Sequence, residues 1–260
     1  MATLEDLRNT WDGLAQRDPL GAILTDPSRI GGKWPLAEFM ATGDAEIDIV
    51  LKHLGAIGHV PSFGGAALDF GCGVGRLTHA LARRFTSCIG LDISPHMIES
   101  ARALNQDAHC RYLLLTGSVL PFPDLTFSFV YSNIVLQHLP RKYAARYLRE
   151  LQRVLEPGGV LVFGVQDRFA TPDLSSVVIR IRNILRIRSR LRSALGQSGG
   201  EMQMHCLPEY AVREALRSAT LVDVQLTNTA AKDFNGRLQY LSQPPARGYV
   251  GKQYCVVKGR

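Results

Sequence analysis

The stretch Ala67–Ala82, ALDFGCGVGRLTHALA, decides the fold. An apolar run ends in Asp69, glycines follow at positions 71, 73 and 75, and a helical pattern begins after the last of them. Glycine lets the backbone turn sharply and approach a ligand that a Cβ would hold away, while the start of a helix supplies free N–H groups. The stretch therefore predicts a buried strand, a tight ligand-binding turn and a helix.

A second acid marks the end of the next apolar run. Asp92 closes the run CIGLDI, seventeen positions after Gly75. A carboxylate at the tip of a second strand can accept two hydrogen bonds from the vicinal hydroxyls of a ribose. Asp69, directly before the glycines, would repel a pyrophosphate but could bind an ammonium group, which favours an amino-acid-bearing nucleoside over NAD. The G-x-G-x-G spacing also differs from the G-x-G-x-x-G of dinucleotide folds, which counts against an NAD-linked oxidoreductase.

Short apolar runs alternate with helical patterns along the rest of the chain. Ser94 is an expected N-cap, with Pro95 at the first helical position. The runs RYLLLT, FSFVYSNIVL, GVLVFGV, LVDVQLT and QYCVVK bring the expected strands to seven. Alternation of this kind predicts a parallel sheet with right-handed crossovers. The expected fold class is therefore α/β, with a doubly wound, mostly parallel, seven-stranded, Rossmann-like sheet.

The order of these motifs resembles the class I S-adenosylmethionine-dependent methyltransferases, particularly the methyltransferase-11 type group. The matching segments are LDFGCGVG, LDIS, TGSVLPFPDLTFSFVYSNIVLQHL and RVLEPGGVLVFGV, within roughly residues 66–165. The resemblance implies the strand order 3-2-1-4-5-7-6 with the last strand antiparallel. It also implies methyl transfer from S-adenosyl-L-methionine, with S-adenosyl-L-homocysteine (SAH) as product. The acceptor would be a small or medium-sized metabolite offering a hydroxyl, amine or carbon atom.

The same resemblance implies a cofactor site. Asp69 and the glycine loop would hold the methionine end, and Asp92 the ribose. Ser118 and Val119 would contact the adenine, and Asn133 would line the site near the sulfonium. The expected cofactor-binding residues are Asp69, Gly71, Cys72, Gly73, Gly75, Arg76, Asp92, Ile93, Met97, Ser118, Val119, Asn133 and Gln137.

Two positions depart from the family pattern. Ser118 stands where the family commonly has an acid that reaches the adenine amino group, and Ser128 stands where it commonly has an aspartate before the fourth strand. Adenine would then be held more by backbone and apolar contacts. These serines also leave open a cofactor-binding protein without turnover, a regulator or pseudoenzyme.

Two histidines are the catalytic candidates. Methyl transfer is an in-line displacement, so alignment in a dry pocket can supply most of the catalysis. A hydroxyl or acidic carbon acceptor still requires a base, and His205 or His138 could serve. The alternatives are a packed histidine at position 138 and a cap for the last helix at position 205.

Two segments lie outside the regular alternation. Residues 1–60 carry two helical patterns and are expected to form an N-terminal helical cap before the cofactor-binding domain, residues 61–260. Residues 171–200 form an inserted segment that contains IRIRNILRIRSRLRS and favours a basic helical lid. The alternatives for its role are a solvated face, a clamp for an anionic substrate, or a peripheral contact with an anionic membrane.

Composition limits the remaining possibilities. The net charge of +7 leaves an RNA methyltransferase as an alternative function. However, no base-amine motif follows the fourth strand and no RNA-binding module is visible. RNA and DNA are therefore disfavoured as partners. The five cysteines are dispersed, which argues against disulfides and structural zinc. The polar N-terminus and strand-sized apolar runs predict a cytoplasmic protein without a transmembrane segment. The acceptor and the oligomeric state are left open.

Overall fold

The computed structural model describes residues 3–170, 202–216, 219–231 and 234–259. The expected basic lid, residues 171–200, lies outside these ranges. Before the first strand the chain forms three helices, α1 (Leu4–Arg17), α2 (Pro19–Ile23) and α3 (Leu36–Ala56). The division into a cap and a cofactor-binding domain stays a prediction.

One sheet forms the centre of the molecule, in the order β3-β2-β1-β4-β5-β8-β6-β7. Its strands are β1 (Ala66–Phe70), β2 (Ser87–Asp92), β3 (Cys110–Leu114), β4 (Phe127–Ser132), β5 (Leu155–Phe169), β6 (Ala219–Thr227), β7 (Tyr240–Leu241) and β8 (Tyr249–Lys258). Strands β1 to β5 pair in parallel, and β8 is antiparallel to both of its neighbours, β5 and β6. The doubly wound, mostly parallel sheet and its antiparallel last strand are confirmed.

The expected number of seven strands is wrong, because the sheet has eight. The additional strand, β7, has two residues and pairs with the end of β6, at Leu226 and Thr227. Two residues are too few to show the alternation by which a strand is identified in a sequence. Without β7, the observed order is the expected 3-2-1-4-5-7-6.

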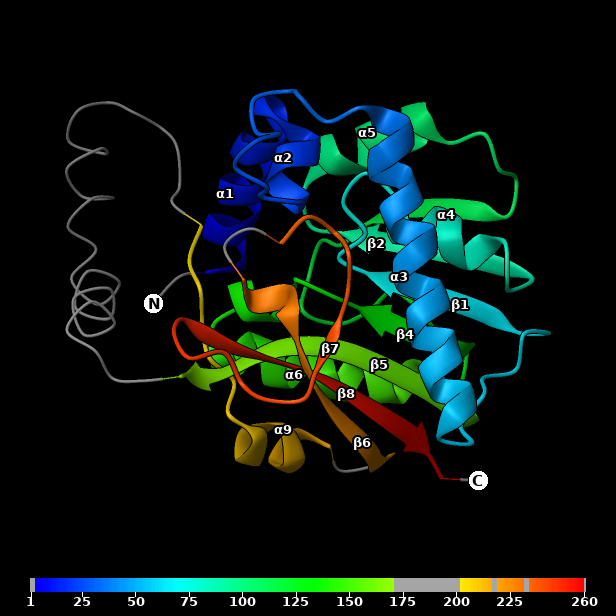
Figure 1. Ribbon diagram of the computed structural model, residues 1–260. Coiled ribbons are helices and arrows are strands. Elements are labelled where there is room, and N and C mark those ends of the chain that lie inside the picture. Colours follow the sequence, from blue (N-terminus) through cyan, green and yellow to red (C-terminus); the bar gives the residue numbers. More distant parts are fainter. Residues whose placement is uncertain (1–2, 171–201, 217–218, 232–233, 260) are drawn as a thin grey trace.

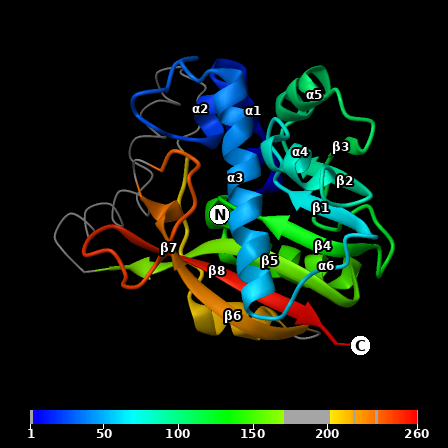
Figure 2. The same cartoon turned by 45° about the vertical axis from the view of Figure 1, so that its right-hand side comes forward.

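Helices cover both faces of the sheet (Figures 1 and 2). On one face, α3 packs with α4 (Arg76–Ala82) and α5 (Pro95–Leu104), and their apolar side chains share one core with strand residues such as Phe129. On the other face lie α6 (Arg141–Val154) and α9 (Glu209–Ala215), whose side chains share a second core with Leu161. Two 3-10 turns, η1 (Leu136–His138) and η2 (Asn228–Ala230), follow β4 and β6.

The start of α5 forms as its sequence predicts. Ser94 is the N-cap, and its hydroxyl accepts a hydrogen bond from the backbone N–H of Met97, while Pro95 occupies the first turn. Asp12 of α1 adds to this turn, since its Oδ1 accepts from Ser94 Oγ and from the N–H of His96, both at 2.8 Å. The first helix of the chain is therefore attached to the helix that follows β2.

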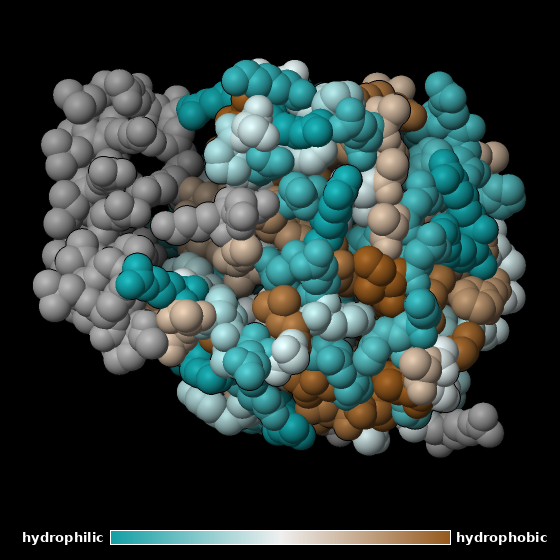
Figure 3. Space-filling view, in the orientation of Figure 1, coloured by the Kyte–Doolittle hydropathy of each residue, from teal (hydrophilic) through white to brown (hydrophobic). Residues whose placement is uncertain are grey.

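The surface seen in Figure 1 is mostly hydrophilic, and hydrophobic side chains gather over its lower part, above β6 and β8 (Figure 3). Leu221, Val222 and Val224 of β6 are only partly buried. This part of the sheet is therefore less covered than its centre. Within the described ranges, no helix combines the length and apolarity needed to cross a membrane.

Candidate functional site

The turn after β1 requires glycine at two positions. Gly71 has a φ of +81° and Gly73 a φ of +53°, in the left-handed region that other residues rarely adopt. A Cβ at Gly71 would collide with the side chain of Val135, and one at Gly73 with that of Ile23. The loop thus comes close to segments from β4 and α2, and it leaves room for its own backbone only.

Asp92 lies at the end of β2, directly beside this turn. Its Oδ2 accepts a hydrogen bond from the N–H of Gly73 at 2.9 Å, and its Oδ1 accepts one from the N–H of Ser94 at 2.9 Å. Burial raises the pKa of this carboxyl, and the two N–H donors oppose the rise. Each carboxylate oxygen keeps lone-pair capacity for a further donor.

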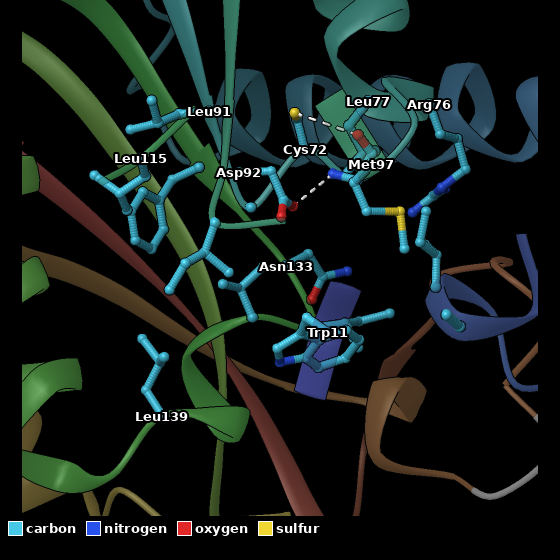
Figure 4. Close-up of a pocket in the computed structure, with 18 of the residues that line it drawn as sticks. Trp11, Cys72, Arg76, Leu77, Leu91, Asp92, Met97, Leu115, Asn133 and Leu139 are labelled. Atoms are coloured by element: carbon cyan, nitrogen blue, oxygen red, sulfur yellow. Dashed lines mark hydrogen bonds between the residues drawn. The ribbon is translucent and has the colours of Figure 1, made fainter. Parts of the chain in front are cut away.

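A narrow cavity of about 90 Å³ lies over the turn. The glycine loop, Asp92 and Asn133 line it from the sheet side, and Trp11 lines it from α1 (Figure 4). Phe70, Leu115 and Tyr147 line it as well, so the cavity is mostly apolar with few polar groups. We call it the loop cavity.

A buried acid on α3 fixes two of the residues around the loop cavity. Glu46 is inaccessible to solvent, and its Oε2 lies 2.8 Å from Nη2 of Arg76, which is also buried. Its Oε1 accepts from the hydroxyl of Tyr131 and from Nδ2 of Asn133, both at 2.8 Å. Oδ1 of Asn133 is buried and has no partner among the described residues. The carboxylate thus orients the Asn133 amide and compensates the Arg76 charge.

A second, larger cavity of about 830 Å³ adjoins the loop cavity. The two share Ala22, Ile23 and Ile134 in their linings. The wall of the larger one is mainly aromatic and apolar, with Phe169, Met202, Met204, Phe234, Leu241 and Tyr249. We call it the acceptor cavity, because its size falls within the range of small-molecule sites, about 300–1,000 Å³.

Comparison with known proteins agrees with this geometry. Residues 68–163 match a family model described as a methyltransferase domain. The 2-methyl-6-phytyl-1,4-hydroquinone methyltransferase of Synechocystis sp. is 34% identical over 162 residues, which are 61% of this chain and 50% of that protein. The trans-aconitate 2-methyltransferase of Methylobacterium radiotolerans is 43% identical over 109 residues, 41% of this chain and 40% of that protein. The structure of magnesium protoporphyrin IX methyltransferase from Synechocystis with bound SAH has a TM-score of 0.62 and 16% identity, covering 99% of this chain and 100% of that one.

Residues 68–163 therefore resemble a methyltransferase domain, and the fold of the chain is similar to that of a solved methyltransferase. The chain's match to the two curated relatives extends over 50% and 40% of their lengths, so it spans about half of each or less. The structural likeness, at 16% identity, concerns the fold alone.

The loop cavity brings together most of the cofactor-binding residues that the resemblance implies. Those in its lining are Gly71, Cys72, Gly73, Arg76, Asp92, Ile93, Met97 and Asn133. They come from the turn after β1, the start of α4, the end of β2, the start of α5 and the residue after β4. Their role in binding stays a prediction, and their common location supports it.

Asp69 lies elsewhere. It is fully buried, its Oδ2 accepts a 2.7 Å hydrogen bond from Thr78 Oγ1 of α4, and its Oδ1 has no partner in the described part of the chain. Burial raises its pKa to about 7. Successive side chains of a strand point to opposite faces, and the neighbouring Phe70 is the one that lines the loop cavity. The expected contact of Asp69 with a methionine end is therefore not supported by this geometry, which makes Asp69 an anchor between β1 and α4.

Three other expected contacts also lie outside the lining of the loop cavity. Gly75 begins α4, with the ring of Tyr112 beside its Cα. Ser118 and Val119 follow β3 at the surface, and the Val119 side chain is 55% exposed. Leu115, three residues before Ser118, lines the loop cavity instead.

Gln137 and His138 line the acceptor cavity and not the loop cavity. Nδ1 of His138 lies 3.0 Å from the carbonyl oxygen of Gln203, and burial lowers the pKa of this histidine to about 4. The backbone N–H of His205 donates to the backbone carbonyl oxygen of Gln137 at 2.6 Å. The ring Nε2 of His205 is buried without a partner among the described residues. Burial lowers the pKa of His205 too. Both rings are therefore neutral near pH 7.

Glu46 was not predicted as a site residue, although the sequence contains a signal for it. Glu46 lies four residues before Val50 and eight before Leu54, on the face that α3 buries. An acid on a buried helical face requires a partner, and Arg76 in the glycine motif was an available one.

Proposed function

We propose that this protein transfers the methyl group of S-adenosyl-L-methionine to a small or medium-sized metabolite with an apolar body. The observation that carries the proposal is the junction of the two cavities at Ile134, next to Asn133. A cavity with a ribose-type carboxylate lies there beside a larger, mostly apolar one. The relatives named above for a hydroquinone and for trans-aconitate act on acceptors of this size, which supports a small molecule as acceptor.

The residues of the loop cavity suit the cofactor. Asp92 has lone pairs left for two ribose hydroxyls, and Asn133 has an unpartnered buried oxygen. The side chains of Ile23 and Val135 pack against the glycine turn between them. The space of about 90 Å³ is smaller than the roughly 300 Å³ of typical small-molecule sites, so the lining has to separate for entry. Leu7 and Trp11 of α1 are the side chains that can withdraw without disturbing the sheet.

When bound, the cofactor supplies an electrophilic methyl group on a sulfonium. Asp92 would hold the ribose, and Asn133, oriented by Glu46, would offer its free Oδ1 to the positive end of the ligand. The apolar wall of the acceptor cavity would exclude water from the reacting atoms and strengthen these interactions.

His138 is the better placed of the two candidate bases. Because its Nδ1 faces the carbonyl oxygen of Gln203, the hydrogen resides there and the lone pair resides on Nε2. Nε2 would take the proton of a hydroxyl or carbon acceptor. Its pKa of about 4 makes it a weak base, which suits an acidic acceptor such as a phenol or enol.

Calorimetric titration with SAH, with NADH as control ligand, tests the proposal. We expect SAH to bind with a micromolar or lower Kd and NADH not to bind. An acceptor screen with labelled methyl donor then tests turnover. Absence of SAH binding would contradict the proposed function, and binding without methylation of any acceptor would favour a protein that binds the cofactor without turnover.

A further inference from the structure

Gln166 is an unusual residue in the wall of the acceptor cavity. It lies near the end of β5, its side chain is 1% exposed, and neither Oε1 nor Nε2 has a hydrogen-bond partner among the described residues. The backbone carbonyl oxygen of Gln166, by contrast, accepts a hydrogen bond from the backbone N–H of Leu207 at 2.8 Å. A buried carboxamide without hydrogen-bond partners destabilises a fold. A ligand group that pairs with the carboxamide would explain why the chain has glutamine at this position.

Two other buried glutamines are well paired, Gln253 and Gln152. On the adjacent strand β8, Oε1 of Gln253 accepts from the hydroxyl of Tyr240 at 2.7 Å, and its Nε2 donates to the hydroxyl of Tyr131 at 3.3 Å. Nε2 of Gln152 donates to two backbone carbonyl oxygens, at 2.7 and 3.1 Å. The packing of this fold therefore satisfies such amides elsewhere.

The position of Gln166 relates it to the proposed reaction centre. Gly164, two residues earlier on the same face of β5, lies directly against Oδ1 of Asn133. Two residues of a strand span about 7 Å, which is the length of a substituted aromatic ring. An acceptor whose reacting atom lies beside Asn133 would therefore bring a group on its far side to Gln166. The lining of the acceptor cavity includes the apolar side chains of Phe169 and Met204.

We propose that Gln166 determines acceptor specificity by binding a hydrogen-bond donor and acceptor that lie side by side on a flat, apolar body. A carboxamide, a carboxylic acid and a hydroxyl next to a carbonyl all have this arrangement. The carboxamide of Gln166 offers the complementary pair, and its terminal torsion is broad enough for the group to turn toward an occupant. The role in methyl transfer rests on the proposed function, whereas the binding preference does not.

A stability comparison tests whether the Gln166 amide is unpaired. We expect Gln166→Leu to keep or raise the Tm, because it removes a buried amide that has no partner. Gln253→Leu is the matched control, expected to lower the Tm because it breaks two hydrogen bonds. If Gln166→Leu lowers the Tm as much as the control does, the amide is a structural group and the proposal fails. Gln166→Met, which keeps the length of the side chain, replaces the leucine variant if that variant does not fold.

A binding comparison tests the specificity directly. The probes are 2-naphthamide and 2-isopropylnaphthalene, which share a body and differ in the paired donor and acceptor, titrated with and without saturating SAH. In Gln166→Leu we expect the ratio of the two affinities to move against the amide by about 10- to 100-fold relative to the wild type. An unchanged ratio, or a wild type that binds neither probe, overturns the proposal. A changed ratio in a protein that fails to bind SAH would sustain the role of Gln166 and reject the proposed function.

Discussion

Replacement of Glu46 by Gln perturbs one buried charge whose surroundings are well defined. The carboxylate lies beside the Arg76 guanidinium, with side-chain exposures of 0% and 3%, and also accepts from Tyr131 and Asn133. The amide of Gln has one acceptor oxygen, so it cannot serve all three donors, and it leaves the guanidinium buried without a countercharge. Breaking a buried pair in this way costs about 3–5 kcal/mol. For a chain of this size that corresponds to a fall in Tm of about 6–20 °C.

The matched control is Glu38→Gln. Glu38 pairs with Arg29 at the surface, with side-chain exposures of 58% and 33%, and such a pair contributes less than about 1 kcal/mol. Differential scanning calorimetry and urea unfolding of both variants give the comparison. If Glu46→Gln costs no more than Glu38→Gln, the buried pair does not contribute as inferred. The double variant Glu46→Gln/Arg76→Met identifies the cause, because removal of the stranded cation should recover part of the loss.

Three further predictions concern ligand binding and pH. Asp92→Asn should weaken SAH binding about 10- to 100-fold in calorimetry, because one acceptor oxygen replaces two, and an unchanged affinity would remove Asp92 from the site. In a Trp34→Phe variant, Trp11 is the remaining tryptophan, and SAH should change its fluorescence emission because the ring lines a cavity that must widen to admit a ligand. No change in emission at saturating SAH would mean that α1 keeps its position. Because the folded pKa of His138 is about 4 and its ordinary value is 6.5, the unfolded chain binds the proton more readily, and stability falls as pH drops below 6.5. Between pH 7.5 and 5 the wild type should lose about 2 kcal/mol more than His138→Gln in urea unfolding, and equal losses would show that His138 does not cause the decline.

Local signals were sufficient for most of the fold. The glycines after β1, Asp92 after β2 and the Ser94 cap each depend on neighbours within a few residues, and the structure has them as the sequence predicts. The order of the strands was implied by the resemblance, and the alternation of strands and helices predicted the parallel sheet. Among the strands of the described residues, the two-residue β7, whose formation depends on β6, was not predicted. The short helix α2 (Pro19–Ile23) was not predicted either.

Contacts between distant segments were not predictable in the same way. Glu46 bonds to residues 85 and 87 positions away, and no local pattern indicates which of its possible partners the fold brings near. Asp69 shows a different limit, because a strand buried on both faces has no polar side to reveal which way a residue points. Gln166 was missed for a third reason, since an unpaired amide can be recognised only when all of its surroundings are known.

The attachment of α1 has a consequence for the order in which the chain folds. Arg8 donates to the carbonyl oxygen of Thr116, 108 positions later, and Asp12 accepts from the first turn of α5, more than 80 positions later. A 14-residue helix is marginally stable in water by itself. Helix α1 therefore docks after β1 to β3 have assembled, and only then is the loop cavity covered on this side. Early in folding the glycine turn is open on the side that α1 later covers, which is the same state that cofactor entry requires.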